Sequence, residues 1–326
     1  MSMILHGTVS DNVVALDRKT VPPIFINGDM GIWQRGTALA SSSGNYACDR
    51  FWYAGTGATS QRSTDVPSGF IYSNKLTYGS SDMSIGQPIE LPATGKQGIF
   101  IAGQTVTIAF YGKVDSGTEA ITVNINARNE KFSGTNSTSF TTSDNAVTLT
   151  TDWQRFTKTF TIPTINANNV MLAFELGGIS KTAYFTGFQC ELGTYDTNSI
   201  ADFQFEDVGT SLARCQRYCR VYGTGEASYQ QFGDLGVAIN TTSAQICFPF
   251  NPEMRTIPSL SNSGNLGLGT GASIIAMTAI AINTNKDTRQ SAGVTATVSS
   301  GLTAHKVYRI DQNNSSSSVV TFDAEL

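Results

Sequence analysis

Short runs of alternating apolar and polar residues, separated by turn-forming residues, recur between Ile24 and about Tyr195. In "TVTIAFYGKV", for example, Val106, Ile108 and Phe110 lie on one face of an extended chain. Side chains that repeat every two residues alternate between the two faces of a β-sheet. No long helical pattern separates these runs, so this part of the chain is predicted to form a two-sheet antiparallel sandwich.

The same alternation predicts which side chains enter the core of this sandwich. In "ITVNINAR" and "NVMLAFEL" the apolar positions fall on one face and the polar positions on the other. The residues predicted to face the core, beyond those already named, are Ile121, Val123, Ile125, Val170, Leu172 and Phe174.

The segment "DVGTSLARCQRYCRVYG", residues 207–223, carries the one convincing helical pattern. Thr210 or Ser211 is predicted to cap its start, and Gly223 is predicted to end it. Its basic residues are interpreted as a solvated face, with an interdomain salt bridge as the alternative. Strand-like runs resume after Gly223, which predicts a second, smaller β-sandwich.

These patterns predict an all-β chain of four parts. They are an N-terminal arm (1–23), a first sandwich (24–200), a short linker helix (201–223) and the second β-domain (224–326). The arm ends in "VPP", which favours an extended connection, and a disordered tail is the alternative interpretation.

Composition narrows the classes of partner. Only 14% of the residues are charged, the net charge is −4, and no basic face is apparent, so nucleic acid is not an expected partner. No stretch approaches the roughly 18 apolar residues of a membrane span, and the first residues lack the pattern of a secretion signal, so membrane insertion is not expected.

The sequence offers little catalytic or metal chemistry. It has two histidines, no "GxSxG" or "HExxH" motif and no phosphate-cradling loop, so no enzyme is predicted, although carboxylates that converge in space stay possible. Its five scattered cysteines are interpreted as reduced, buried thiols, with Cys215 and Cys219 lacking the partners of a zinc site. Neither cofactor nor metal is predicted; Asn27, Asp29 and Glu191 are weak calcium candidates.

"FINGDMGIWQRGT", residues 25–37, allows two interpretations of Trp33. In the first, this segment is an edge strand that enters the sandwich with Trp33 packed inward. In the second, Trp33 is exposed and stacks on a sugar ring.

Three segments together resemble tail-fibre and related virion proteins of tailed bacteriophages and prophages. They are "INGDMGIWQRGT" with "YACDRFWY", the linker "FTGFQCELGTYDTNSIADFQFEDVGTSLARCQRYCRVYG", and "FPFNPEMRTIPSL" with the final "FDAEL". The linker motif C-Q-R-Y is the most specific, while Cys190 stands where a larger apolar residue is common and the arm matches no known pattern.

The resemblance implies a sugar-binding-module-like jelly roll followed by a C-terminal β-domain. It also implies a non-enzymatic virion component, such as a homotrimeric fibre or spike that attaches to other virion proteins through the arm and faces the host surface. A capsid-decorating or neck protein and a polysaccharide depolymerase are the alternatives. The resemblance favours the buried interpretation of Trp33, and we expect Arg35 and Asp49 to pair beside it.

Modules of this shape bind sugars on a sheet face or at edge loops. The polar and aromatic residues opposite the predicted core form the candidate glycan site, because ring stacking and polar side chains together recognise saccharides. They are Tyr111, Asn124, Asn126, Arg128 and Glu175. An ordinary solvated or trimer-facing sheet surface is the alternative. Trp52 and Tyr53 alternate, so one of them is expected to point away from the core.

Overall fold

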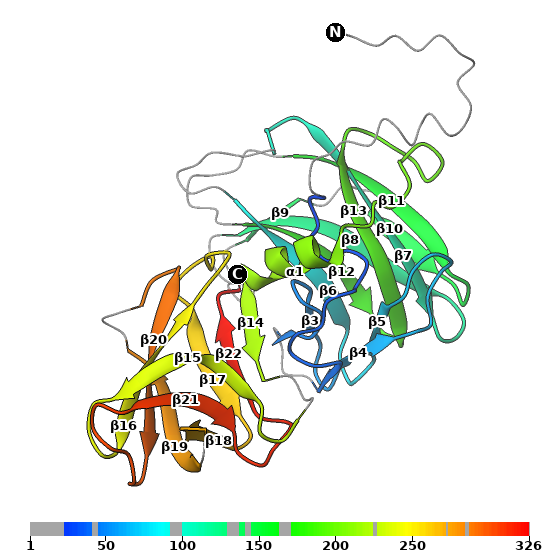
Figure 1. Cartoon of the computed structure of the whole chain (residues 1–326). Helices are drawn as coiled ribbons and strands as arrows, with labels where there is room; N and C mark the ends of the chain where they lie inside the picture. Colours follow the sequence, from blue (N-terminus) through cyan, green and yellow to red (C-terminus); the bar gives the residue numbers. More distant parts are fainter. Residues whose placement is uncertain are drawn as a thin grey trace, which may run out of the picture.

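The computed structural model describes residues 23–40, 45–91, 100–128, 137–140, 145–162, 171–223, 227–271, 273–283 and 287–325. Two β-structures lie side by side in Figure 1, with one short helix between them. The predicted all-β fold class is confirmed. The predicted N-terminal arm, apart from Pro23, lies outside the described residues.

The first β-structure is a sandwich of two antiparallel sheets. In spatial order, the described strands of the first sheet are β1 (Ala38–Ala40), β4 (Thr59–Ser63), β5 (Ser73–Thr77), β13 (Ala183–Leu192), β7 (Thr105–Val114) and β11 (Gln154–Thr161). Those of the second sheet are β10 (Ala146–Leu149), β8 (Glu119–Arg128), β12 (Met171–Ile179), β6 (Met83–Glu90), β3 (Trp52–Ala54) and β2 (Asn45–Tyr46), and β9 (Ser137–Phe140) pairs with β8. Chain neighbours such as β7 and β8 lie in different sheets.

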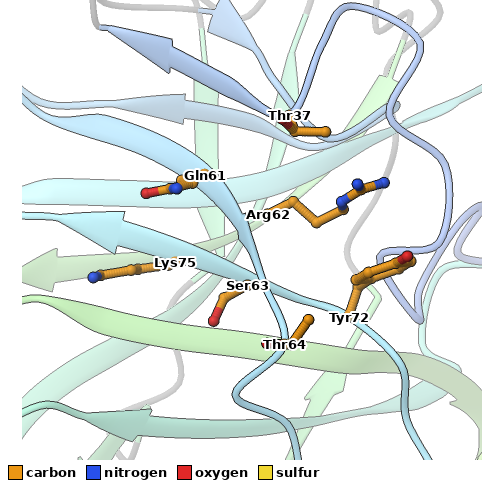
Figure 2. A pocket seen from close by; sticks show the side chains of 7 residues that line it. All are labelled: Thr37, Gln61, Arg62, Ser63, Thr64, Tyr72 and Lys75. Carbon is orange, nitrogen blue, oxygen red and sulfur yellow. The ribbon is translucent and has the colours of Figure 1, made fainter.

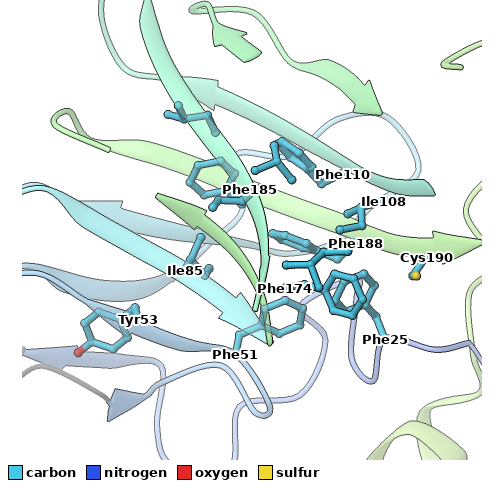
Figure 3. Packing of buried hydrophobic residues seen from close by; sticks show 14 of the residues in the cluster. Phe25, Phe51, Tyr53, Ile85, Ile108, Phe110, Phe174, Phe185, Phe188 and Cys190 are labelled. Atoms are coloured by element: carbon cyan, nitrogen blue, oxygen red, sulfur yellow. The ribbon is translucent and has the colours of Figure 1, made fainter. Parts of the chain in front are cut away.

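Aromatic and aliphatic side chains fill the space between these two sheets. Phe110 stacks on Phe188 with their ring centroids 5.7 Å apart, and Phe25 meets Phe174 edge to face at 5.2 Å (Figure 3). The core positions predicted from alternation are confirmed as buried, except Val170, which lies outside the described residues. Burial of this apolar area removes it from water and is the main favourable term for the sandwich.

The helix α1 (Val208–Gln216) is shorter than the sequence predicts. The carboxylate of Asp207, not Thr210 or Ser211, accepts the capping bond from the Thr210 amide at 3.1 Å. The pattern that continued to Gly223 instead gives a strand, β14 (Cys219–Tyr222), because Cys219 and Tyr222 extend along β22. Tertiary pairing therefore overrides the helical spacing.

The second β-structure is a closed barrel with a small sheet, where a smaller sandwich was predicted. Its described barrel strands are, in order, β15 (Gln231–Ala238), β16 (Ser243–Pro249), β20 (Ser291–Val298), β19 (Ile274–Ile282), β18 (Leu266–Gly269) and β21 (Val307–Gln312). The sheet orders β14, β22 (Val319–Asp323) and β17 (Ser259–Ser263). Alternation is the same in sandwiches and barrels, and only the pairing of β15 with β21 closes the ring.

The segment 24–37 is a series of turns, so the predicted edge strand there is wrong. Asn27 and Met30 adopt left-handed backbone angles, with φ of 59° and 57°. The Asn27 side chain organises the turns, accepting from the Ile32 amide at 2.8 Å and donating to the Asp49 carbonyl at 2.9 Å. Trp33 is 9% exposed and packs in the sandwich core, which confirms the buried interpretation.

Ion pairs join the sandwich to Asp323 at the end of β22 and to Glu325 just after it. Arg35 pairs with Asp49 at 3.4 Å, as predicted, and also with Asp323 at 3.0 Å and Glu325 at 3.3 Å. Arg50, whose side chain is 1% exposed, donates to the carboxylate of Glu325. Because Asp323 and Glu325 come from the second β-structure, these pairs fix its position on the sandwich.

The linker adds a second set of contacts to this junction. Arg217 pairs with Glu90 on β6 at 3.0 Å, and the Tyr218 hydroxyl donates to the same carboxylate at 3.0 Å. Arg214 pairs with Glu206 at 2.8 Å, and Arg220 is buried. The predicted solvated basic face is therefore wrong, and the alternative of an interdomain salt bridge is confirmed for Arg217. Arginine suits such positions because its planar head donates to several acceptors.

Four of the five cysteines behave as predicted. Cys48, Cys190, Cys215 and Cys219 are buried free thiols, whereas Cys247 is a free thiol at the surface. Burial raises the pKa of Cys190, because an apolar environment disfavours the thiolate. No helix in the described part of the chain has the length and apolarity needed to cross a membrane.

Removing the Glu325 charge is expected to destabilise the junction strongly. In Glu325→Gln the Arg50 guanidinium stays buried without its carboxylate, which costs about 3–5 kcal/mol. The control is Glu253→Gln, which breaks two partly exposed pairs, with Arg289 and, at 3.9 Å, with Arg217, and costs under about 1 kcal/mol. Urea unfolding measures the loss of stability in each variant. Equal losses in the two variants would contradict the role of the Arg50–Glu325 pair at the junction.

Asp49 is expected to make stability depend on pH. Burial raises its pKa from 3.8 to about 6, and the opposing attraction of Arg35 and hydrogen bond from Gln34 only partly offset this. Between these values the folded chain binds a proton that the unfolded chain has lost, so the free energy of unfolding falls as pH rises from about 4 to 6. In urea titrations across this pH range, the free energy of unfolding of Asp49→Asn should fall less steeply than that of the unmodified chain. The variant should also be less stable, because it loses the pair with Arg35. Parallel pH curves, or unchanged melting of the variant, would refute this role.

Candidate functional site

Cross-strand pairing gathers a row of polar and aromatic side chains on the outer face of the first sheet. Gln61 on β4 pairs with Lys75 on β5, Lys75 pairs with Tyr184 on β13, and Tyr184 pairs with Lys113 on β7. Directly paired residues project from the same face, so these four side chains stand side by side. Trp153, which precedes β11, lies at the Lys113 end of the row. We call these five residues the aromatic–cationic row.

Short contacts hold this row in place. The Trp153 and Tyr184 rings meet edge to face at 6.4 Å, and the Lys113 ammonium lies 5.1 Å from the Tyr184 ring centroid. The Asp65 carboxylate, from the loop after β4, pairs with Lys113 at 2.6 Å and accepts from the Trp153 indole at 2.9 Å. Partial burial alone would raise the pKa of Asp65, but these hydrogen bonds hold it below its usual value. The aromatic groups are thus positioned before any ligand arrives.

An open pocket of about 460 Å³ continues the row at its β4–β5 end. Gln61 and Lys75 belong to both, and in Figure 2 they lie on one side of the pocket while Arg62 and Tyr72 lie together on the other. The Arg62 guanidinium is 4.4 Å from the centroid of the Tyr72 ring. The remaining lining residues supply hydroxyl groups: Thr37, Ser63 and Thr64.

The predicted site residues do not form one site. Tyr111 lies on β7 in the first sheet, whereas Asn124, Asn126 and Glu175 lie on β8 and β12 in the second sheet. Arg128 is the last residue of β8, where its backbone pairs with Met171, and its side chain lies outside the described part of the structure.

Tyr111 is largely occupied by protein contacts. Its ring packs 5.3 Å from Phe70, which in turn contacts Phe203 and Phe205. The Arg155 guanidinium lies 5.8 Å from the same ring and donates to the Ala201 carbonyl. This half of the first sheet is therefore covered by the residues that lead into the linker.

The second-sheet residues face one another. Asn126 donates to the Glu175 carboxylate at 3.2 Å, and Asn145 donates to Asn124 at 2.9 Å. Trp52 points away from the sandwich core in the same cross-strand row as Glu175 and Asn124, but it is 2% exposed. Nearby, Met171 on the outer face packs against Tyr218 of the linker. Protein contacts therefore already occupy much of this surface.

Two observations bear on the calcium candidates Asn27, Asp29 and Glu191. Among the described residues no three His, Cys, Asp or Glu side chains gather as a metal site, and the Asn27 side chain is hydrogen-bonded to backbone groups.

Sequence reasoning missed the aromatic–cationic row, although alternation in "WQRFTKTFTI" and "TVTIAFYGKV" separates Trp153 and Lys113 from the core positions. The missing information was which strands are neighbours.

A carbohydrate binding domain family matches this chain over residues 52–183. The matched segment runs from β3 to the first residue of β13 and so covers most of the sandwich. Gln61, Lys75, Lys113 and Trp153 lie within it, and Tyr184 follows its last residue. By sequence, part of the sandwich is thus similar to carbohydrate binding domains. No curated protein matches this chain.

Solved structures that are similar to part of this chain include the following three. A structure described as CBM4 is 21% identical, with 51% of this chain and 98% of that chain covered and a TM-score of 0.34. The xylan-binding domain of Paenibacillus barcinonensis Xyn10C is 14% identical over 48% of this chain and 94% of its own, with a TM-score of 0.32. The enzymatically active domain of tailspike protein 4 of bacteriophage CBA120 is 12% identical over 52% of this chain and 21% of its own, with a TM-score of 0.34.

Proposed function

We propose that the chain is a non-catalytic glycan-binding protein and that the aromatic–cationic row is its binding surface. The observation that carries this proposal is the alignment of Trp153 and Tyr184 with three polar side chains on an open sheet face, largely within the segment that matches a carbohydrate binding domain. Aromatic faces stack on the apolar faces of sugar rings, and amide, ammonium and hydroxyl groups bond to sugar hydroxyls.

Contacts around the row favour the first sheet over the second. Asp65 fixes Lys113 and the Trp153 indole, so a bound sugar would not have to order these side chains. On the second sheet the candidate polar groups already pair with each other, and the outward aromatic Trp52 is buried.

Binding is expected to depend on the first sheet. Trp153→Ala should weaken glycan binding about tenfold, because a stacked ring contributes on the order of 1 kcal/mol or slightly more. Tyr184→Ala should have a similar effect, whereas Tyr229→Ala, which removes a 58% exposed ring on the second β-structure, should have none. A glycan array followed by calorimetry measures this, with thermal melting to verify folding.

The second-sheet prediction is tested in the same assay. If Asn124→Ala abolishes binding while Trp153→Ala and Tyr184→Ala retain it, the site lies on the second sheet, where three of the residues predicted from the sequence are found. If no glycan binds the unmodified chain, the binding function itself is refuted.

The biological setting that we propose is a phage virion, where the chain would act as a fibre or spike component that contributes to attachment at the host surface. The three motif segments named above support this setting, and attachment to other virion proteins is assigned to the arm at 1–23. A capsid-decorating or neck role would place the chain away from the host-facing tip and would involve no glycan. Electron microscopy of labelled particles would locate the chain and decide between these roles.

The same motifs support a homotrimer, and the barrel offers a surface for self-association. Val237 on β15 pairs with Val307 on β21, and these two side chains are 44% and 47% exposed. Leu235 and Ile239 on the same strand and its continuation are 68% and 49% exposed. A cluster of large apolar side chains on one face is typical of an interaction site.

Light scattering is expected to give three times the chain mass. The double variant Val237→Lys/Leu235→Lys should reduce the mass to that of one chain. The free-energy cost of burying two unpaired ammonium groups exceeds the favourable free energy of burying the apolar surface between chains. Ile71→Lys, which changes a 72% exposed residue on the sandwich, is the matched control and should leave the mass unchanged. A monomeric unmodified chain would refute the trimer.

A further inference from the structure

The strand β19 has an unpaired edge over part of its length, although the barrel is closed. β18 pairs with β19 only at Ile274–Ala276, whereas β20 pairs with it along the opposite edge from Met277 to Ile282. On the β18 side, no described strand pairs with Met277–Ile282. The backbone N–H and C=O groups on such an edge are available to another polypeptide.

A second unpaired edge lies on the same side. β17 continues through Gly264 and Asn265 into β18, and this continuous stretch pairs along one edge with β22 and then with β21. Its opposite edge pairs with β19 at β18 but has no described partner at β17. β17 and β19 therefore diverge, and a pocket of about 240 Å³ lies between them.

The lining of this pocket suits an uncharged, extended peptide. Leu266, Met277 and Ile280 form its apolar part, and neither a charged side chain nor an aromatic ring lines it. A charged group would find no partner there, and a sugar ring would find no aromatic face for stacking. Amide side chains can donate to and accept from the peptide groups of a bound chain. Three such side chains line the pocket without a hydrogen-bond partner among the described residues: Asn262, Asn265 and Asn313.

The two strands also lack the features that normally protect a strand edge. Exposed edges usually carry charged residues or proline, which prevent pairing with another chain. The sequences of β19 and β17, "IIAMTAIAI" and "SLSNS", contain neither. An edge of this composition therefore remains competent to pair with an added strand.

We propose that the cleft between β17 and β19 binds an extended, uncharged polypeptide segment of a partner protein, which adds a strand to the free edge of β19. Backbone hydrogen bonds to this edge supply affinity, and the amide groups and apolar part of the pocket supply specificity. Because side chains alternate along a strand, the segment carries apolar residues at every second position to face Leu266, Met277 and Ile280. This function is independent of the glycan site, which lies on the first sheet of the sandwich.

The test screens a displayed library of random heptapeptides against the full chain, and the enriched peptides are then synthesised. They are expected to lack charged residues and to alternate apolar and polar residues. Each is also made in two versions, with one or the other set of alternate backbone nitrogens methylated. All side chains are kept, but the donors on one edge are lost, so at least one version should bind tenfold or more weakly.

The place of binding is tested in two ways. Amide hydrogens on the unpaired edge of β19 should exchange more slowly when the peptide is bound. The variant Asn262→Ala/Asn265→Ala should lose about tenfold in affinity for the peptide, because two of the amide groups are removed. Its matched control, Asn198→Ala/Gln290→Ala, removes two exposed amides that lie outside the pocket and should bind like the unmodified chain. Thermal melting verifies that both variants fold.

Several outcomes would overturn the proposal. They are the absence of any enriched peptide, full binding by both methylated versions, or unchanged hydrogen exchange at β19. Loss of glycan binding in Asn262→Ala/Asn265→Ala would instead make the cleft a sugar site, and a changed mass in light scattering would make it a contact between copies of this chain. The glycan site on the first sheet is judged separately, by Trp153→Ala and Tyr184→Ala.

Discussion

The buried ion pair between Arg50 and Glu325 is the contact on which the arrangement of the whole molecule depends. Arg50 lies beside Asp49 in the turn between β2 and β3 of the sandwich, and Glu325 follows the last strand of the second β-structure. Charges removed from water in this way are tolerated only when each has a partner. Arg50 also lies 3.5 Å from the Tyr218 ring centroid, so the sandwich, the linker and the second β-structure meet at one side chain. Their relative position is therefore set by charge pairing as well as by apolar packing.

The sequence pattern was sufficient for the strands and for the faces of the sandwich. Ile108, Phe110, Val123 and Phe174 are buried as alternation predicts, because every second side chain of a paired strand must share one face. The pattern could not distinguish a second sandwich from a barrel, since closure depends on β21 reaching β15 across about 70 residues. The pattern also predicted a helix that is too long, because the pairing of Cys219 with Asp323 competes with the local helical preference.

The candidate site shows the same limit. Tyr111 and Asn124 were grouped because both lie opposite core positions on consecutive strands, β7 and β8. Those strands enter different sheets, so the two side chains face opposite sides of the sandwich. Lys75, Tyr184 and Lys113 are far apart in the sequence and become neighbours only through the crossovers that place β13 between β5 and β7. Single-sequence periodicity gives the face of a residue but not its neighbouring strand.

The two layers of the sandwich meet the linker differently, because its first residues cover one half of the first sheet whereas Arg217 and Tyr218 dock on the second. Tyr218 and Arg217 contact Met171 and Glu90 on the outer side of the second sheet, so the first sheet carries its row on the layer turned away from that contact. Copies that associate through the barrel would accordingly keep every row accessible at once. In the proposed trimer, each additional engaged site would act at a high effective concentration, so a weak single-site affinity would suffice for long-lived adhesion to a repetitive surface.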